Sequence, residues 1–158
     1  MRDGYIQQIG TPQQVFNNPT NLFVAGFIGT PQMNFFDAKL LKEEGKYYVA
    51  LGGEKVELSA EKQQRLAANN AEAQDVTLGV RPEHTVLADK GVAAKVDVSE
   101  MMGSSIHLHV TAEGRDVIII VPTTDTTGHF AIGQAVSFTF GGNVAHVFSK
   151  ETEKNLEW

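Results

Sequence analysis

From residue 34 onward, apolar side chains recur at every second position of the chain. Phe36, Ala38 and Leu40 alternate with Asp37 and Lys39. Successive side chains of a strand point to opposite faces, so this period favours half-buried β-strands. Runs of the same kind occupy residues 47–51, 56–58, 76–80, 92–98, 106–110, 136–140 and 144–148. With turn residues between them, about seven to nine short strands are predicted, in an antiparallel barrel or sandwich.

Two segments depart from that alternation. Val117 to Val121 is a continuous apolar run, which is typical of a strand buried on both faces. Ser59 is a suitable N-cap for a helix over residues 60–68, which Asn69 and Asn70 would end. One short helix among these strands fits an OB-like antiparallel barrel, so the predicted fold class is mainly β.

The composition narrows the classes of function. Acidic residues outnumber basic ones 19 to 13 and no cluster of Lys and Arg occurs, which argues against nucleic acid as a partner. The absence of cysteine excludes disulfides and thiolate metal sites, and is compatible with the cytosol. The longest apolar runs fall far short of the roughly 20 residues that a membrane-spanning helix needs.

The first thirty residues follow a different plan. A short strand is expected over residues 5–9, and Thr11 and Pro12 are a typical N-cap and first residue of a helix. A second, almost wholly apolar helix is expected over residues 22–28, with Gly29 placed to cap it. A strand and two short helices cannot bury so much apolar surface alone. This segment therefore needs a further body to pack against.

A long spaced pattern runs through this segment. It consists of Asp3-Gly4, Ile6, Gln8, Gly10-Thr11-Pro12, Val15-Phe16, Pro19, Asn21, Phe23-Val24-Ala25 and Phe27-Ile28-Gly29. The pattern resembles the C-terminal edge of the nucleotide-binding domain in ATPase subunits of ABC transporters. Pro31, Met33 and Asn34 are similar to a Pro-x-Met-Asn element of the maltose-type importers of oligosaccharides and glycerol phosphates. The resemblance implies that residues 1–30 are a remnant of that domain and residues 31–158 a transport-associated OB domain.

Two further motifs carry the resemblance into the OB domain. Residues 78–84, Leu-Gly-Val-Arg-Pro-Glu-His, are similar to the family's Gly-Ile/Val-Arg-Pro-Glu-His strand and turn. Residues 100–105, Glu-Met-Met-Gly-Ser-Ser, resemble its Glu-x-Met-Gly hairpin. An acidic residue often stands in the family at the position of Ser105, so the tip carries no fixed charge there. The match is loose over residues 39–75 and 111–130.

The family's ATP site is not found in this sequence. It contains no Gly-x-x-x-x-Gly-Lys-Ser/Thr phosphate loop, no Leu-Ser-Gly-Gly-Gln signature and no apolar strand ending in Asp-Glu. The resemblance therefore implies a chain that is not an enzyme, without catalytic, cofactor-binding or metal residues, while ATP and Mg²⁺ belong to the missing domain. The chain is expected to be a piece of a longer protein or a reading frame begun at an internal methionine.

The resemblance implies a regulatory and dimerising module of a sugar importer's ATP-binding subunit. The expected partners are a second copy of the subunit, the membrane subunits through the missing domain, and a cytosolic regulatory protein. The expected location is the cytoplasm, peripheral to the inner face of the cell membrane in the intact complex. The residues expected to contact the second copy or the regulator are Arg81, Glu83, His84, Glu100, Met101, Met102, Gly103 and Ser104.

Simpler interpretations of these residues stay open. Arg81 and Glu83 could pair locally and tie the barrel to its neighbour. Met101 and Met102 either form an exposed apolar patch, which often marks a contact, or fold back onto their own barrel.

The histidines also allow two interpretations. His107 and His109 share one face of a strand, either as part of a His-rich surface or as two metal ligands. A third ligand would come from His84, His129 or His146. The alternative functions are an oxyanion-binding OB domain, whose usual Ser-Ala/Gly-Arg-Asn turn is missing, and an oligonucleotide-binding OB domain, which needs aromatics interleaved with Lys and Arg.

Overall fold

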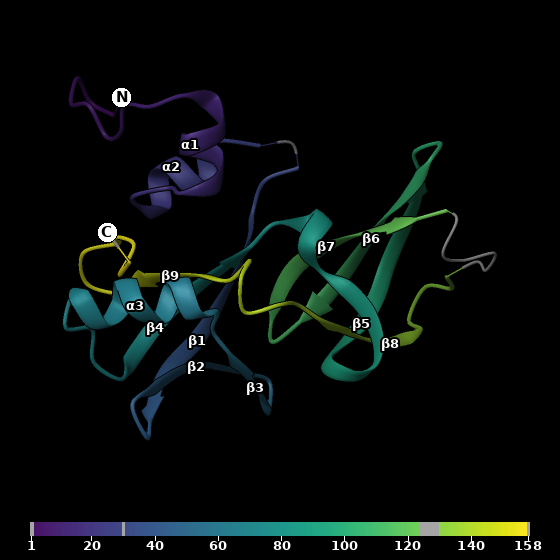
Figure 1. The fold of residues 1–158 in the computed structure, drawn as a ribbon. Coiled ribbons are helices and arrows are strands. Elements are labelled where there is room, and N and C mark those ends of the chain that lie inside the picture. Colours follow the sequence, from purple (N-terminus) through teal and green to yellow (C-terminus); the bar gives the residue numbers. More distant parts are fainter. Residues whose placement is uncertain (1, 30, 124–129, 158) are drawn as a thin grey trace.

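The computed structural model describes residues 2–29, 31–123 and 130–157. Within these ranges the chain is mainly β, with nine strands in two antiparallel sheets and only short helices. The mainly β fold class is therefore confirmed. Figure 1 shows the two sheets side by side, with the N-terminal helices above the first of them.

The first sheet has five strands in the order β3-β2-β1-β4-β9. Its strands are β1 (Asn34–Glu43), β2 (Lys46–Leu51), β3 (Glu54–Glu57), β4 (Gln74–Val80) and β9 (His146–Ser149). Helix α3 (Ala60–Ala68) lies between β3 and β4 in the chain, and Ser59 caps it by accepting a hydrogen bond from the backbone N–H of Lys62. Five strands with a helix after the third are the arrangement expected of an OB-like unit.

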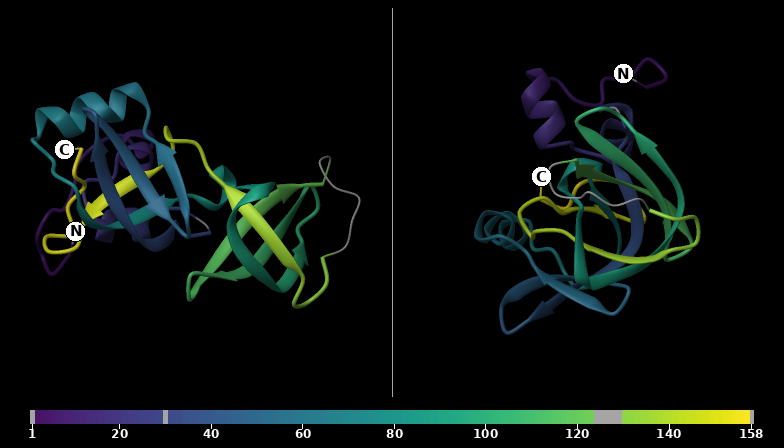
Figure 2. Two further views of the ribbon diagram at one scale, coloured as in Figure 1. Left: turned by 90° about the horizontal axis from the view of Figure 1, so that it is seen from below. Right: turned by 90° about the vertical axis from the view of Figure 1, so that its right-hand side faces the viewer.

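The second sheet has four strands in the order β7-β6-β5-β8. Its strands are β5 (Val86–Met101), β6 (Ser105–Ala112), β7 (Arg115–Pro122) and β8 (Ala135–Thr139). A single 3₁₀ turn, η1 (Pro82–His84), leads from β4 into it. This sheet is thus inserted between the fourth and fifth strands of the first, and Figure 2 shows the two lobes that result.

Two of the contacts that join the sheets come from β1. The rings of Phe36 on β1 and Phe138 on β8 stack with centroids 5.8 Å apart in one continuous apolar core. The side chain of Asn34 donates to the carbonyl of Ile118 at 2.8 Å and accepts from its N–H at 2.9 Å. Asn34 therefore pairs with the edge of β7 as another strand would, which gives the asparagine of the Pro-x-Met-Asn element a structural role.

The N-terminal segment forms the two predicted helices, α1 (Pro12–Asn17) and α2 (Leu22–Phe27). Thr11 caps α1 in a capping box with Gln14, as its position predicted. The strand expected over residues 5–9 is wrong, since this part has only an isolated bridge between Arg2 and Tyr5. A strand needs a hydrogen-bonding neighbour, and no second strand lies alongside these residues in the described ranges.

The helix over residues 60–68 is confirmed, while the apolar run on β7 differs from its prediction. Val117, Ile119 and Val121 are buried, but Ile118 and Ile120 are only half-buried. Antiparallel sheets commonly leave one face partly open to solvent, and the neighbouring strand β6 has the same half-buried positions on this face. Periodicity also could not divide the strands between two sheets, because it identifies strands and not their partners. Among the described residues, no helix is both long and apolar enough to span a bilayer.

Candidate regulatory site

Arg81 lies at the junction between the first sheet and the N-terminal helices. Its side chain is only 1% exposed. Its Nη1 donates to the carbonyl of Ile28, its Nη2 donates to the carbonyl of Phe16 at 3.0 Å, and its guanidinium lies over the Phe16 ring, 4.0 Å from the centroid. Burial lowers the pKa of this guanidinium, which the nearby charge of Glu83 partly opposes. Arg81 therefore fastens the N-terminal segment to the OB part.

Two glycines make room for this junction. Gly29 follows α2 with φ of +106°, and a Cβ there would lie 2.6 Å from Nη1 of Arg81. A Cβ on Gly79 of β4 would overlap the sulfur of Met33. The Pro-x-Met-Asn and Gly-Val-Arg-Pro-Glu-His motifs thus pack directly on each other, and this close approach explains why a glycine precedes the arginine.

A hollow of about 220 Å³ opens beside Arg81. It is lined by Phe16, Asn17 and Asn18 of the N-terminal segment, by Glu61, Lys62 and Arg65 of α3, and by Arg81, His84, Asn143, Val144 and His146. The pKa of His146 falls to about 3, because the imidazole is buried and lies near the positive charges of Lys62 and Arg81. His146 is therefore neutral at physiological pH.

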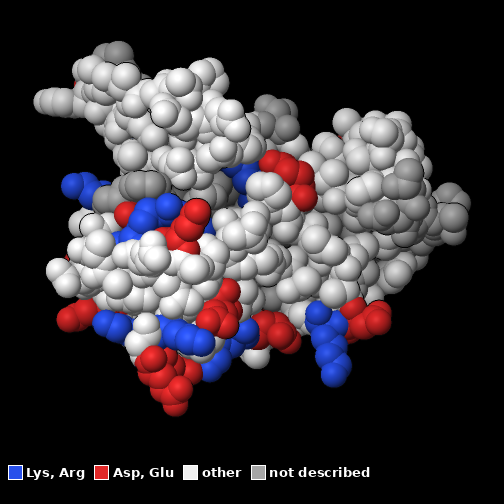
Figure 3. Space-filling view, in the orientation of Figure 1, with Lys and Arg blue, Asp and Glu red and all other residues white. Residues whose placement is uncertain are grey.

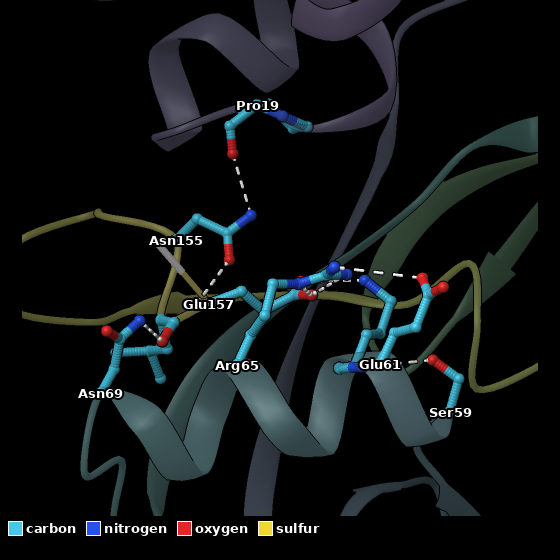
Figure 4. Close-up of polar contacts among 9 residues, drawn as sticks. Pro19, Ser59, Glu61, Arg65, Asn69, Asn155 and Glu157 are labelled. Atoms are coloured by element: carbon cyan, nitrogen blue, oxygen red, sulfur yellow. Dashed lines mark hydrogen bonds and ion pairs between the residues drawn. The ribbon is translucent and has the colours of Figure 1, made fainter.

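The C-terminal tail closes the same junction from another side (Figure 4). Asn155 donates from Nδ2 to the carbonyl of Pro19 at 2.9 Å and accepts from the N–H of Glu157 at 3.0 Å. The carboxylate of Glu157 lies 2.8 Å from Lys62 Nζ and 2.9 Å from Arg65 Nη2. Burial lowers the pKa of Lys62, although Glu157 favours its charged form. The tail thus connects α3 to the chain between α1 and α2.

The tip of the β5–β6 hairpin is built differently. Met101 and Met102 are 66% and 52% exposed, so the interpretation that they fold back onto their own barrel is wrong. The N–H of Met102 donates to the carbonyl of Ser105 at 2.8 Å, and Gly103 takes a positive φ in the turn. The Glu100 carboxylate lies 2.5 Å from Nε2 of His109. The tip is an exposed apolar pair beside a carboxylate.

The structure does not bring the eight predicted contact residues into one site. Arg81 and His84 line the hollow, Glu83 is exposed on η1, and residues 100–104 form the hairpin tip, which Figure 1 draws at the outer end of the second lobe. No ion pair joins Arg81 to Glu83 in the described part of the chain, so the interpretation as a local pair is wrong. The other part of that interpretation is confirmed, since Arg81 does tie the OB part to the neighbouring N-terminal segment.

The pair of histidines on β6 lies as predicted on one face. Both are half-buried, and His109 contacts Glu100. Among the described residues, no three His, Cys, Asp or Glu side chains gather in a way that could hold a metal ion. His129, one of the candidate third ligands, lies outside the described residues.

Sequence reasoning did not find three features of the junction. Asn34 was recognised only as part of a motif, and its spacing gave no sign of a partner on β7. The pair of Lys62 and Glu157 joins residues 95 positions apart, so no local pattern could indicate it. His146 was considered only as a metal ligand, because its burial on β9 follows from tertiary packing.

The two N-terminal helices contain no charged residue. The sequences of α1 and α2 contain no Asp, Glu, Lys or Arg, and Figure 3 shows this part as mostly uncoloured, while charges line the lower edge over β1–β3. Tyr5, Ile6, Ile9 and Phe27 are exposed large apolar side chains. Exposed apolar side chains in such number are typical of a segment that packs against another body.

Comparisons with known protein families agree with this architecture. Residues 29–85 match the model of the MalK OB fold domain, and residues 78–148 match that of the TOBE domain. The first match contains β1 to β4, and the second contains the whole second sheet. Residues 29–85 therefore belong to the MalK OB fold domain family and residues 78–148 to the TOBE domain family, in agreement with the motifs.

Curated relatives point the same way. The chain is 34% identical over 164 residues to the oligosaccharides import ATP-binding protein MsmX of Bacillus subtilis, which covers 99% of this chain and 43% of that protein. It is 35% identical over 160 residues to the sn-glycerol-3-phosphate import ATP-binding protein UgpC of Ruegeria pomeroyi, which covers 99% of this chain and 41% of that protein. The chain thus spans less than half the length of these relatives.

A solved structure shares the fold. The cytoplasmic molybdate-binding protein ModG superposes with a TM-score of 0.56 over 71% of this chain and 92% of its own. Its sequence identity is 14%, so the likeness concerns the fold alone. It therefore carries no argument about a ligand of this chain.

Proposed function

We propose that this chain is the regulatory and dimerising region of the ATP-binding subunit of an importer for sugars of the oligosaccharide or glycerol-phosphate class. The observation that carries the proposal is the joint match to the MalK OB fold and TOBE domains, with relatives named as import ATP-binding proteins along almost the whole chain. Neither matched domain is an ATPase, and the chain contains no phosphate loop. The ATP and Mg²⁺ sites would lie in a domain that precedes α1.

The proposed mechanism is mechanical. The ATPase domain would pack on the exposed apolar side chains of the N-terminal segment, which include Tyr5, Ile6 and Ile9. Arg81 and Asn155 hold that segment to the OB part, so a motion of one would be passed to the other. A contact between two copies would keep two ATPase halves at a high effective concentration. A cytosolic regulator acting on this region could hold the halves apart.

Calorimetry with ATP and Mg²⁺ tests whether the ATP site lies outside this chain, as proposed. The chain should give no saturable heat, whereas the full-length MsmX of Bacillus subtilis should, since its name describes an ATP-binding protein. Specific binding of ATP by this chain at micromolar concentration would contradict the proposal.

A mixing experiment tests the tether. An excess of the chain, added to a full-length homologous subunit, should form mixed dimers and lower ATP hydrolysis, because only one half of each mixed dimer carries an ATPase domain. ModG is a suitable control protein, since it shares the fold at only 14% identity. An equal effect of ModG, or no effect of the chain at any excess, would argue against a tethering role.

A further inference from the structure

Three residues that line the hollow beside Arg81 each hold a buried nitrogen without a hydrogen-bond partner. These atoms are Nε of Arg81, Nδ1 of His84 and Nδ1 of His146. The side chains of Arg81 and His146 are 1% and 7% exposed, so bulk water does not solvate them. Buried polar groups in folded proteins are almost always paired. Three exceptions around one hollow indicate a space that holds a polar occupant.

The chemistry of Arg81 decides the polarity of that occupant. A guanidinium stays protonated and can only donate hydrogen bonds. Its Nη1 and Nη2 donate to the carbonyls of Ile28 and Phe16, whereas Nε is the nitrogen of this guanidinium that has no partner. A neutral imidazole can present Nδ1–H as a donor as well. All three atoms therefore suit an occupant that accepts hydrogen bonds.

The charges around the hollow favour an anion. Lys62, Arg65 and Arg81 line it with three positive charges. The single charge of Glu157 is shared between Lys62 and Arg65, and the Glu61 side chain is largely exposed and lies 4.0 Å from Arg65. The remaining balance is positive, and a hollow of about 220 Å³ has room for a small ion.

We propose that this hollow binds one small oxyanion, of the class of inorganic phosphate, sulfate or a short carboxylate. Its oxygens accept hydrogen bonds from Nε of Arg81 and from Nδ1 of His84 and His146. The lining residues come from the N-terminal segment and from the OB part, so a bound anion joins the two. The site does not depend on the proposed function, because it would bind its ligand in this chain alone.

The titration of His146 supplies a specific readout. Without a ligand the imidazole is faced by Lys62, Arg65, Arg81 and His84, and the pKa of His146 lies at about 3. An anion among these cations favours the charged imidazole, so it raises this pKa. The carboxylates of Glu61 and Glu157 are already present in the free protein and do not change between the two states.

The test follows the histidine ring protons of the whole chain by NMR. Inorganic phosphate, sulfate and acetate are titrated separately, with sodium chloride keeping the ionic strength constant. The signals of His84 and His146 should shift and saturate, while those of His107 and His109 on β6 should not move. At saturation the titration midpoint of His146 should rise by about one pH unit or more. Saturation by acetate as well would show that the site accepts a short carboxylate, as proposed.

Matched variants locate the binding. His84→Ala and His146→Phe should each weaken the binding about tenfold, as expected for the loss of one hydrogen bond to a charged group. His107→Ala should leave it unchanged. His84 is only half-buried, so His84→Ala should keep the fold and decides the matter if His146→Phe does not fold.

Two outcomes overturn the proposal. The first is a shift that none of the three anions saturates beyond the sodium chloride control, which would mean that only water occupies the hollow. The second is saturable binding that both His84→Ala and His107→Ala leave unchanged, which would place the anion elsewhere.

Discussion

The junction around Arg81 and the tip of the β5–β6 hairpin carry the two most recognisable motifs of the OB part, yet they are built in opposite ways. At the junction, polar side chains from four separate parts of the chain are buried against one another. At the tip, Met101 and Met102 are exposed, where β5 ends and the turn to β6 begins. The motif around Arg81 was expected to contact a partner, but its arginine instead binds another part of the same chain. The junction should respond to substitution by losing stability, and the tip by losing partners.

The largest effect is expected for Glu157→Gln. The change removes the negative charge between Lys62 and Arg65 and leaves the ammonium of Lys62 buried without its ion-pair partner. Removing one partner of a buried ion pair costs about 3–5 kcal/mol. Urea unfolding should show this loss as a lower midpoint with an unchanged slope.

Glu151→Gln is the matched control for that change, since Glu151 is an exposed acid of the same tail. It should change the free energy of unfolding by less than about 0.5 kcal/mol. Equal midpoints for the two variants would show that the junction is no more tightly built than the surface.

The second largest effect is expected on acidification, which should lower the free energy of unfolding through His146. The pKa of His146 is about 3 in the folded chain and about 6.5 when the chain unfolds, so the unfolded state binds more protons between these values. Stability therefore falls as the pH falls through this window. Each pH unit costs about 1.4 kcal/mol, or roughly 2–3 kcal/mol from about pH 6.5 to about pH 4.5. The measurement is the free energy of unfolding against pH, in a buffer without oxyanions.

The variant His146→Phe isolates this term. It should show a smaller loss of stability over the same pH range, because the phenyl ring does not titrate. A pH profile parallel to that of the unchanged chain would mean that His146 is not held neutral by its surroundings.

Local patterns in the sequence were sufficient for most of the fold. Ser59 and Asn69 bound α3 as predicted, because capping depends on neighbouring residues. The alternation around Phe36 and Leu40 predicted β1, since the face of a strand depends only on the period. The strand predicted after Asp3 is wrong, because a strand needs a partner to hydrogen-bond with. The division into two sheets could not be predicted, because strand pairing depends on residues far apart in the sequence.

The candidate site was harder to predict for the same reason. The resemblance to the family identified Arg81 but not the direction of its side chain, which points into the junction and donates to Phe16 and Ile28. The partners of Lys62 and Asn34 lie 95 and 84 positions away in the chain. The surroundings of an exposed residue such as Met101 were easier to predict, because they are formed by its own hairpin.

Arg81→Met should destabilise the junction less than the loss of Glu157. It removes two hydrogen bonds from a charged donor, but it also relieves the burial of that charge, and α1 can then move so that water reaches the freed carbonyls. A loss of about 2 kcal/mol is expected, with faster amide exchange in α1 and α2. Lys95→Met, at an exposed cation of β5, should change neither quantity. Unchanged exchange in α1 would contradict the role of Arg81 as a fastening.

The smallest effect on stability is expected at the tip. Met101→Ser combined with Met102→Ser should change the free energy of unfolding by less than about 0.5 kcal/mol, because both side chains are already in water. Its effect should appear instead in self-association, since most soluble homo-oligomers are two-fold dimers with a self-complementary surface and this apolar pair is a candidate for it. Light scattering at rising concentration should show a dimer for the unchanged chain and a weaker one for the double variant.

Val86→Ser provides the matched control for the tip, because Val86 is an exposed apolar residue at the other end of the same long strand β5. It removes a similar apolar group without touching the hairpin, so dimerisation should persist. A chain that stays monomeric at about 1 mM, which corresponds to an association free energy weaker than about −4 kcal/mol, would rule out a stable dimer of this region alone. A dimer that survives the double variant would place the contact on another surface, and the contrast between a buried fastening and an open contact would then apply to the junction only.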